Sequence, residues 1–404
     1  MTAQEVRSEF PELDVKIYGR NLVYLDNAAT SLRPRCVIDK WTWMSSECNA
    51  NLHRAVHKIA ADATEEYETS RDAVRDFINA ADRREIVFTS GATASINLVA
   101  YSFGEKFIGE GDEIIVTEEE HHSNIVPWQM LCRRKNAILK VLPVDDSGRL
   151  DINLLGDMIT PRTKLFCVAH ISNVLGLVNP VRELADICHS KGCLILVDGA
   201  QGIVHEKVDV ERLDCDFYAF SGHKMYAAPG TGVLYGKYDI LSKLPPFMGG
   251  GEMIETVSFK STEFAGIPQR FEAGTQNISG IPTFKPAIGM SEKLREIDQS
   301  GITSYLLQAL GNDERIRLFG IPDSKFSKIP LFSFSVIGAH HEDLALILDK
   351  MGIAVRSGQM CAEPLMDRMG VSGMLRASFA PYNTMEEAEY FMKCLGRAIN
   401  MLSR

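Results

Sequence analysis

Asp198 and Lys224 are the two residues whose types and spacing first suggest a reaction. Asp198 ends an apolar run that begins at residue 193, and Lys224 closes the tetrapeptide SGHK (221–224) on the loop after the next predicted strand. Pyridoxal phosphate (PLP) needs this pair, because a lysine holds its aldehyde as a Schiff base and a carboxylate keeps its pyridine nitrogen protonated. Taken alone, Lys224 would be read as a surface lysine and Asp198 as a helix-capping aspartate. Together they predict a PLP site.

A second group of residues could bind the phosphate of such a cofactor. The tripeptide GAT (91–93) stands between a short apolar run and a long apolar segment. A glycine turn that leads into a helix offers an anion free backbone N–H groups and, through Thr93, a hydroxyl. Ser221 and His223 can add donors to the same phosphate, which leaves Lys224 free for the aldehyde. For this segment alone, an ordinary strand–helix loop with a threonine cap is the alternative.

Three further polar residues follow predicted strands, where they could reach the cofactor. His121 comes after an acidic stretch and could stack on the pyridine ring and transfer protons. Asn173 could bind the substrate or the phenolic oxygen of the cofactor, and the amide of Gln201 could reach the same oxygen. A lone histidine is more often structural, so the role of His121 is a hypothesis that depends on the rest of the site.

Cys361 is the candidate nucleophile. It lies in RSGQMCAEP (356–364), where Gly358 and Arg356 suggest a flexible, electropositive loop. Such surroundings favour a thiolate, and a thiolate is the reactive form of cysteine. A glycine-flanked cysteine is more often incidental, so this prediction needs support from the rest of the chain.

The elements that must position these residues alternate in the middle of the chain. Short β-rich runs are followed by helical patterns, which predicts an α/β fold with a mostly parallel sheet and helices on both faces. Ligands bind such sheets at the carboxyl ends of the strands, where Asp198 falls. The predicted strands are 86–89, 113–117, 164–169, 193–197, 217–220 and 232–235, and the predicted helices are 92–108, one beginning near 124, and 181–191.

A smaller α/β unit is expected in the C-terminal part. We expect a large domain over residues 21–285 and a small C-terminal domain over 286–404 that carries the cysteine, with residues 1–20 packing on the small domain. The predicted helices of the small unit are 287–297, 304–311, 342–351 and 385–402, and its predicted strands are 331–336 and 353–355.

Composition narrows the class of protein. The chain has 404 residues, which is more than one ordinary core requires, and its formal charge of −10 argues against a nucleic-acid partner. No apolar run is long enough to cross a membrane, and the N-terminal residues lack the pattern of a signal peptide, so we expect a cytoplasmic protein. The chain has nine cysteines, but no two pairs of them have the spacing of zinc ligands. We therefore expect no metal site.

Nine sequence strings, in one order and nearly end to end, give the chain a strong family resemblance. It resembles the class V, fold-type I PLP-dependent transferases, and most closely the cysteine desulfurases of the SufS/CsdA type (group II). The strings are YLDNAAT (24–30), NLHR (51–54), TEEEHHSNIVPW (117–128), VDGAQ (197–201), SGHK (221–224), APGTG (228–232), EAGTQN (272–277), RSGQMCAEP (356–364) and LRASF (375–379).

The resemblance implies a role for each matching residue. Lys224 would hold PLP covalently, Asp198 would pair with the pyridine nitrogen, and Thr275 would reach the phosphate of the neighbouring subunit of a homodimer. Arg376 would bind the substrate carboxylate, because a planar guanidinium makes bidentate pairs, although a structural salt bridge is its alternative. The remaining cofactor contacts would be Gln201, His121, Thr93, Ala92, Ser221, His223 and Asn173, and the further substrate contacts would be Asn173, His53 and Arg356.

The resemblance also implies a reaction. L-Cysteine would become L-alanine, with Lys224 and His121 moving protons, and the sulfur would pass to Cys361 as a persulfide. From Cys361 it would go to an acceptor protein of the SufE or SufU type for iron–sulfur cluster assembly. L-Selenocysteine is an alternative substrate. Two competing hypotheses are a class V aminotransferase or β-lyase in which Cys361 is a bystander, and a non-catalytic scaffold.

Three positions depart from the family's usual pattern. Gln359 and Met360 precede the cysteine, where related enzymes carry a histidine-containing pair, and Met360 cannot relay protons. Ala94 replaces a glutamate that is common in SufS-type enzymes, and Met248 stands where some members of the family carry an acidic residue. We expect these changes to tune the reaction, because the cofactor residues and the nucleophile are present.

Overall fold

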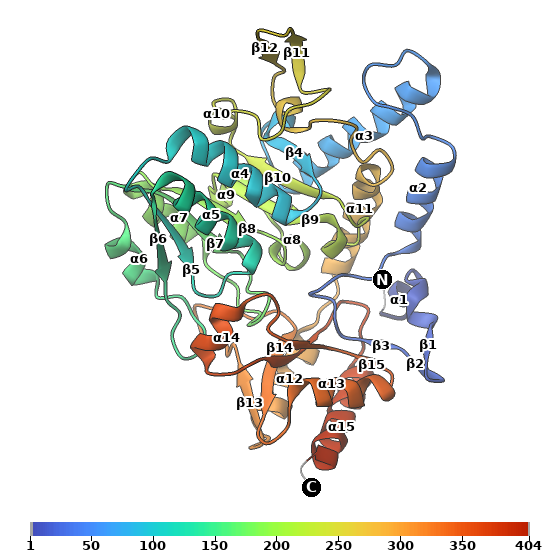
Figure 1. Cartoon of the computed structure of the whole chain (residues 1–404). Coiled ribbons are helices and arrows are strands. Elements are labelled where there is room, and N and C mark those ends of the chain that lie inside the picture. Colours follow the sequence, from blue (N-terminus) through green and yellow to red (C-terminus); the bar gives the residue numbers. More distant parts are fainter. Residues whose placement is uncertain (1–2, 403–404) are drawn as a thin grey trace.

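The computed structural model describes residues 3–402 and is built around a seven-stranded sheet (Figure 1). The strand order is β4-β10-β9-β8-β7-β5-β6. Strands β5 to β9 run parallel, and β10 is antiparallel to both of its neighbours, β4 and β9. The bounds are β4 Ile86–Thr89, β5 Glu113–Thr117, β6 Ile138–Leu142, β7 Thr163–Ala169, β8 Leu194–Asp198, β9 Phe217–Ser221 and β10 Gly232–Gly236.

Successive residues of the central strands enter two different hydrophobic cores, because side chains alternate between the faces of a strand. In β5, Ile115 packs in the core with helices α3, α7 and α11, whereas Ile114 and Val116 pack in the core with α4 and α5. The predicted α/β class, with helices on both faces, is confirmed. The helices of this part are α2 Arg35–Ser46, α3 Lys58–Phe77, α4 Ala92–Phe107, α5 Val126–Lys135, α6 Ile152–Met158, α7 Val181–Ser190, α8 Gly202–His205, α9 Val210–Leu213, α10 Tyr238–Leu241 and α11 Phe284–Arg295.

A second, four-stranded antiparallel sheet forms the C-terminal part, which lies below the large sheet in Figure 1. Its order is β13-β14-β17-β16, and a separate apolar core joins it to α12, α13 and α15. The bounds are β13 Ile316–Phe319, β14 Leu331–Val336, β15 Ile353–Ala354, β16 Arg356–Gly358, β17 Met374–Ser378, α12 Ser300–Gly311, α13 His341–Lys350, α14 Glu363–Met369 and α15 Met385–Leu402.

The N-terminal residues contact both parts of the chain. β3 (Val23–Tyr24) pairs in parallel with β15, and Arg7 donates a hydrogen bond to the carbonyl of Tyr382. The ring of Phe10 contacts both Tyr382 and Tyr226. The packing of residues 1–20 on the small domain and the domain boundary near residue 285 stay predictions. Residues 1–2 lie outside the described residues. The other elements here are α1 Ala3–Ser8, β1 Lys16–Ile17 and β2 Arg20–Asn21.

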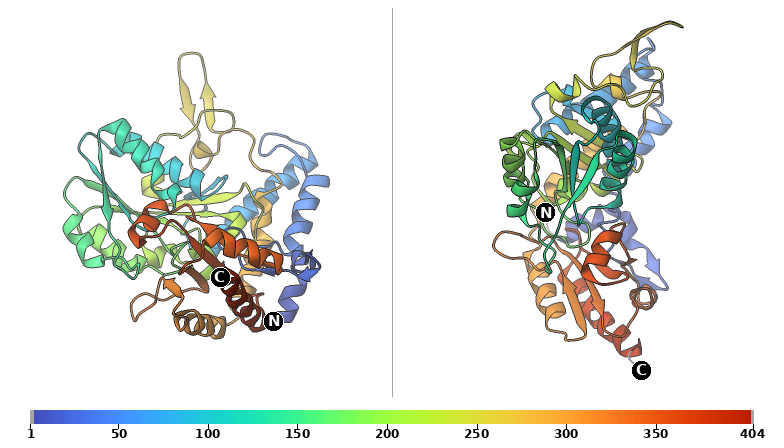
Figure 2. Two further views of the ribbon diagram at one scale, coloured as in Figure 1. Left: turned by 60° about the horizontal axis from the view of Figure 1, so that its bottom comes forward. Right: turned by 60° about the vertical axis from the view of Figure 1, so that its left-hand side comes forward.

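Several strands have no counterpart in the sequence-based prediction. β6 and β13 mix polar and apolar residues at the edges of their sheets, so they lack the continuous apolar run of a buried strand. The hairpin of β11 (Ile254–Val257) and β12 (Thr262–Phe264) projects away from the large sheet in both views of Figure 2. Its side chains are mostly exposed, so the sequence of the hairpin has no pattern of buried apolar residues that would predict the two strands. Between residues 3 and 402, no helix combines the length and the apolar character needed to cross a membrane.

Candidate active site

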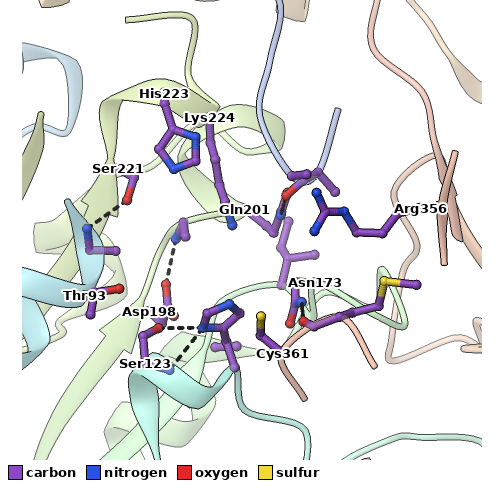
Figure 3. A pocket seen from close by; sticks show the side chains of 18 of the residues that line it. Thr93, Ser123, Asn173, Asp198, Gln201, Ser221, His223, Lys224, Arg356 and Cys361 are labelled. Atoms are coloured by element: carbon purple, nitrogen blue, oxygen red, sulfur yellow. Dashed lines mark hydrogen bonds between the residues drawn. The ribbon is translucent and has the colours of Figure 1, made fainter. Parts of the chain in front are cut away.

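A cavity of about 210 Å³ lies where the carboxyl ends of β5, β7, β8 and β9 face the small C-terminal sheet (Figure 3). Parallel strands end at one edge of a sheet, so side chains that are far apart in the sequence meet there. The cavity is lined by Ala28, Ala29, Ala92, Thr93, His121, Ser123, Ala169, Ile171, Asn173, Asp198, Ala200, Gln201, Ser221, His223, Lys224, Arg356, Met360, Cys361 and Arg376.

Lys224 projects into the middle of this cavity from the short helical turn that follows β9 (Figure 3). Burial lowers the pKa of its ammonium from 10.5 to about 8, although the nearby Asp198 carboxylate acts in the opposite direction. In the part of the chain that the structure describes, its amine has no hydrogen-bond partner. Lys224 is therefore an amine that can lose its proton near neutral pH and is free to react.

Asp198 lies on the floor of the cavity at the end of β8. Its carboxylate is buried and accepts a hydrogen bond from the N–H of Ala200 at 3.0 Å. Burial raises its pKa, while the charge of Lys224 and the Ala200 N–H oppose the rise. No ion pair of Asp198 exists among residues 3–402, so the carboxylate lacks a close cationic partner.

The N-terminus of α4 forms one wall of the cavity. The N–H of Ala92 donates to the hydroxyl of Ser221 at 2.8 Å, which ties the helix to the end of β9. The chain reaches Ala92 through Gly91, whose φ of 151° suits glycine, and a Cβ on Gly232 would lie 2.3 Å from the Cα of Gly91. The close approach brings the hydroxyls of Thr93 and Ser221 to the same wall (Figure 3).

His121 is neutral in this site. The N–H of Ser123 donates to Nδ1 of His121 at 3.1 Å, so the ring proton lies on Nε2. Burial, assisted by the charge of Lys224, lowers its pKa from 6.5 to about 4. The pKa of His223 is similarly lowered to about 4, mainly by burial. Both imidazoles can therefore donate one hydrogen bond and accept another near neutral pH.

Two buried carboxyl groups behind His121 were missed by the sequence reasoning. Glu120 accepts hydrogen bonds from the Ala169 N–H at 2.8 Å and from the side chains of Thr117 and Asn124, each at 2.6 Å. Burial raises the pKa of Glu120 to about 8 and that of Glu119 to about 7. The acidic stretch that precedes His121 therefore contains two buried groups, and the hydrogen bonds of Glu120 fix the end of β5 against β7.

Two arginines share one carboxylate on the opposite side of the cavity. Arg376 is only 2% exposed, and its guanidinium donates to the carbonyl of Asn173 at 2.8 Å and to Asp26 at 3.1 Å. Arg356 donates to both oxygens of Asp26 at 3.2 Å, and its side chain is 44% exposed. One carboxylate between two guanidinium groups leaves a positive charge that a substrate carboxylate can balance. Asp26 was missed, although it stands in the string YLDNAAT.

Cys361 enters the cavity from the loop between β16 and α14, opposite Lys224 (Figure 3). It is exposed, and it is close enough to Lys224 and Arg376 for its charge to affect the pKa values of both. The amide of Asn173 donates to the carbonyl of Met360 at 2.9 Å and so ties the loop to the end of β7. The nucleophile predicted in the C-terminal part and the lysine predicted in the large sheet therefore line one cavity.

Two predicted residues lie outside the cavity of their own chain. Thr275 lines a separate cavity of about 320 Å³ beside Glu272 and Phe247. The ring of His53 is 3.1 Å from the carboxylate of Glu68 and does not line the site. Their proposed roles stay predictions. Gln201 lines the cavity, and its amide donates to the carbonyl of Ala28 at 2.8 Å.

The residues present fit PLP. The buried carboxylate of Asp198 suits a pyridinium N–H, and the partner-free amine of Lys224 suits an aldehyde. The start of α4, with the hydroxyls of Thr93 and Ser221, suits a phosphate. Within the described chain, no group of three or more histidine, cysteine, aspartate or glutamate side chains is arranged to hold a metal ion.

Comparisons with known proteins agree with this chemistry. Residues 23–391 match the family described as aminotransferase class-V. The chain is 42% identical to a probable cysteine desulfurase of Vibrio cholerae, over 98% of both chains. It superimposes on the cysteine desulfurase CsdA of Escherichia coli with a TM-score of 0.90 at 38% identity, covering 100% and 99% of the two chains. It also superimposes on a cysteine desulfurase of Thermococcus onnurineus with a TM-score of 0.92 at 36% identity, covering 100% of this chain and 98% of the other.

Proposed function

Because the chain belongs to the aminotransferase class-V family, and within it to the cysteine desulfurases, we propose that it converts L-cysteine to L-alanine and retains the sulfur as a persulfide on Cys361. One observation carries the proposal. An exposed thiol on the loop after β16 and a partner-free lysine on the turn after β9 line the same cavity. A transaminase or a β-lyase would need the lysine alone.

PLP supplies an electron sink that makes the α-proton of a bound amino acid acidic. Lys224 would hold its aldehyde and Asp198 its pyridine nitrogen, with His121 against the ring and Gln201 near the phenolic oxygen. The phosphate would be bound by Ala92, Thr93, Ser221 and His223.

Lys224 would carry out the proton transfers, with His121 as a hydrogen-bond donor beside it. A pKa of about 8 allows the Nζ atom of Lys224 to accept the α-proton of the substrate and to return a proton at carbon. His121 is neutral, with its proton on Nε2, so this N–H can donate a hydrogen bond to a group in the cavity. Together they supply one proton acceptor and one hydrogen-bond donor within the same site.

The two arginines orient the substrate. Arg376 is held in place by Asn173 and Asp26, so it can bind the substrate carboxylate without first being ordered. Arg356 adds a second positive charge to the lining of the cavity, and Asn173, which also lines it, would assist in binding the substrate.

Cys361 carries out the sulfur transfer. Its Sγ atom, as a thiolate, attacks the sulfur of the substrate. An S–S bond forms while the bond between that sulfur and the substrate β-carbon breaks, and the electron pair of the broken bond stays on carbon. The carbon is then protonated to give alanine, and the sulfur remains on Cys361.

The test is the formation of alanine by PLP-loaded protein and by the variants Cys361→Ala and Cys36→Ala. Cys36 is a half-buried thiol that does not line the cavity, so its replacement is the matched control. We expect the Cys36 variant to keep the wild-type rate and the Cys361 variant to lose most of the activity with L-cysteine. Undiminished alanine formation by Cys361→Ala would exclude the persulfide route.

The proposal extends to partners and location. We propose a homodimer in which Thr275 reaches the partner's phosphate, since it lies outside the cavity of its own chain. A sulfur acceptor protein of the SufE or SufU type, in iron–sulfur cluster assembly, would take the sulfur from Cys361, whose exposure leaves it accessible. A reducing cytoplasm would keep all nine cysteines free. Parallel assays with L-selenocysteine test the alternative substrate.

A further inference from the structure

His122 connects the large sheet to the cysteine loop without facing the cavity. It is the first residue of a short helical turn (His122–Asn124) that follows β5. Its backbone N–H donates to the carbonyl of Cys361 at 2.7 Å, and its side-chain Nε2 accepts from the N–H of Glu363 at 3.0 Å. The neighbouring residues His121 and Ser123 line the cavity, whereas His122 does not. Its side chain is hydrogen-bonded to the loop, and its ring centroid lies 6.3 Å from that of His121.

The helix that follows the cysteine lacks a cap of its own. A helix leaves its first N–H groups without intrahelical partners, and a side-chain acceptor at the N-cap usually satisfies one of them. The N-cap of α14 is Ala362, which has no side-chain acceptor. The imidazole of His122, from the turn that follows β5, supplies the missing acceptor to Glu363.

The loop adopts a backbone conformation that must be held. Met360 and Cys361 have φ values of 54° and 56°, in the left-handed region that residues with a Cβ rarely occupy. Three hydrogen bonds from the large domain fix this segment. One comes from the amide of Asn173 to the Met360 carbonyl, and the other two involve His122. Two of the three ties therefore come from His122, one from its backbone N–H and one from its imidazole.

We propose that His122 is the positioning residue that holds the Cys361 loop against the large domain and so keeps the thiol at the cavity. The inference rests on the proposed role of Cys361 as the sulfur acceptor. His122 acts through the lone pair on Nε2, with its proton on Nδ1. A neutral side chain with an acceptor at similar reach can replace it, so glutamine preserves the function and alanine does not.

Hydrogen exchange tests the positioning directly in the PLP-loaded protein without substrate. In His122→Ala, we expect the amide of Glu363 to exchange about fivefold faster, since the loss of a cap corresponds to a factor of roughly 2 to 30. The matched control is His340→Ala. The Nδ1 atom of His340 accepts from the N–H of Glu342 at 3.4 Å at the start of α13, so the same kind of bond is lost at another helix. That variant should leave exchange at Glu363 unchanged.

Steady-state kinetics provide the second readout. The kcat for alanine formation should fall about fivefold to tenfold in His122→Ala, while KM stays within about twofold because Arg376 is untouched. His122→Gln should recover most of both kcat and exchange protection. A glutamine variant as defective as the alanine variant would overturn the inference, because the imidazole would then be needed for proton transfer.

Two further results would decide against the proposal. Wild-type exchange at Glu363 in His122→Ala overturns the positioning role and leaves the desulfurase proposal intact. If the alanine variant does not fold, ¹⁵N NMR of the wild-type imidazole replaces it. We expect Nδ1 to be protonated and Nε2 to be a bare acceptor, and the opposite tautomer overturns the inference. If no form makes alanine, the proposed function fails, and the exchange data still decide the role of His122.

Discussion

Replacing Arg376 by lysine should weaken the use of L-cysteine far more than the same change at Arg356. Both arginines line the cavity and both pair with Asp26, but Arg376 is 2% exposed and the Arg356 side chain is 44% exposed. The pair that Arg376 would form with the substrate carboxylate is of the buried, hydrogen-bonded kind. Removing one partner of such a pair costs about 2 to 5 kcal/mol of binding free energy, because the remaining charge stays desolvated. An exposed pair is worth only about 0.2 to 1 kcal/mol.

These energies convert into separable effects on kcat/KM. For Arg376→Lys, which keeps the charge but loses the planar fork, we expect a loss at the lower end of the buried range, about 2 kcal/mol or roughly 30-fold. For Arg356→Lys, we expect a loss of less than about fivefold. The loss at Arg376 should appear mainly in KM, because the carboxylate contact is the same before and during the reaction.

The assay is alanine formation at varied L-cysteine concentration with PLP-loaded variants. The absorbance of the bound cofactor and the melting temperature serve as controls, since Arg376 also donates to the Asn173 carbonyl. A larger loss in Arg356→Lys than in Arg376→Lys would refute the assignment of the carboxylate site. A loss below about fivefold in Arg376→Lys would refute it as well.

Three further predictions follow from burial. Iodoacetamide should modify one thiol per native chain, at Cys361, because the other cysteines are buried or half-buried; peptide mass spectrometry that finds a second thiol equally fast would contradict this. Burial raises the pKa of Glu119 from 4.5 to about 7, so the folded state binds more protons than the unfolded state between these values and stability falls as pH rises through this range. The drop in melting temperature between about pH 5 and pH 8 should be smaller in Glu119→Gln, and an unchanged drop would contradict the assignment. Glu272→Ala should cost about 3 to 5 kcal/mol in denaturant unfolding, because its carboxylate pairs with Arg71 and both side chains are at most 2% exposed. Lys325→Ala breaks an ion pair with Glu183 in which the two side chains are 45% and 47% exposed, so it should cost less than about 1 kcal/mol. Equal losses of stability in the Glu272 and Lys325 variants would refute the reasoning.

The central sheet could be predicted because its strands are buried on both faces. Strands β4 and β5 of this sheet, and β14 of the small sheet, have the predicted bounds, and the helices α4 and α15 lie where periodicity placed them. Edge strands such as β6 and the exposed β11–β12 hairpin could not be predicted. The pattern of apolar residues marks a strand only where its side chains are buried, and few side chains of these segments are buried.

The site could be predicted where chemistry is tied to a strand end or to a recognisable string. Lys224, Asp198 and Cys361 come together in one cavity for this reason. Asp26 and His122 were missed because their roles depend on contacts across more than 200 residues, with Arg356 or with the loop that begins at Met360, and spacing along the chain carries no such information.

The most direct test is the mass of the protein after a single turnover with L-cysteine, in the absence of reductant. We predict that alanine forms in an amount equal to the active sites, that the chain gains one sulfur atom, and that peptide mapping places that atom on Cys361. Alanine formed together with free sulfide and an unmodified Cys361, or a sulfur atom on another cysteine, would contradict the account.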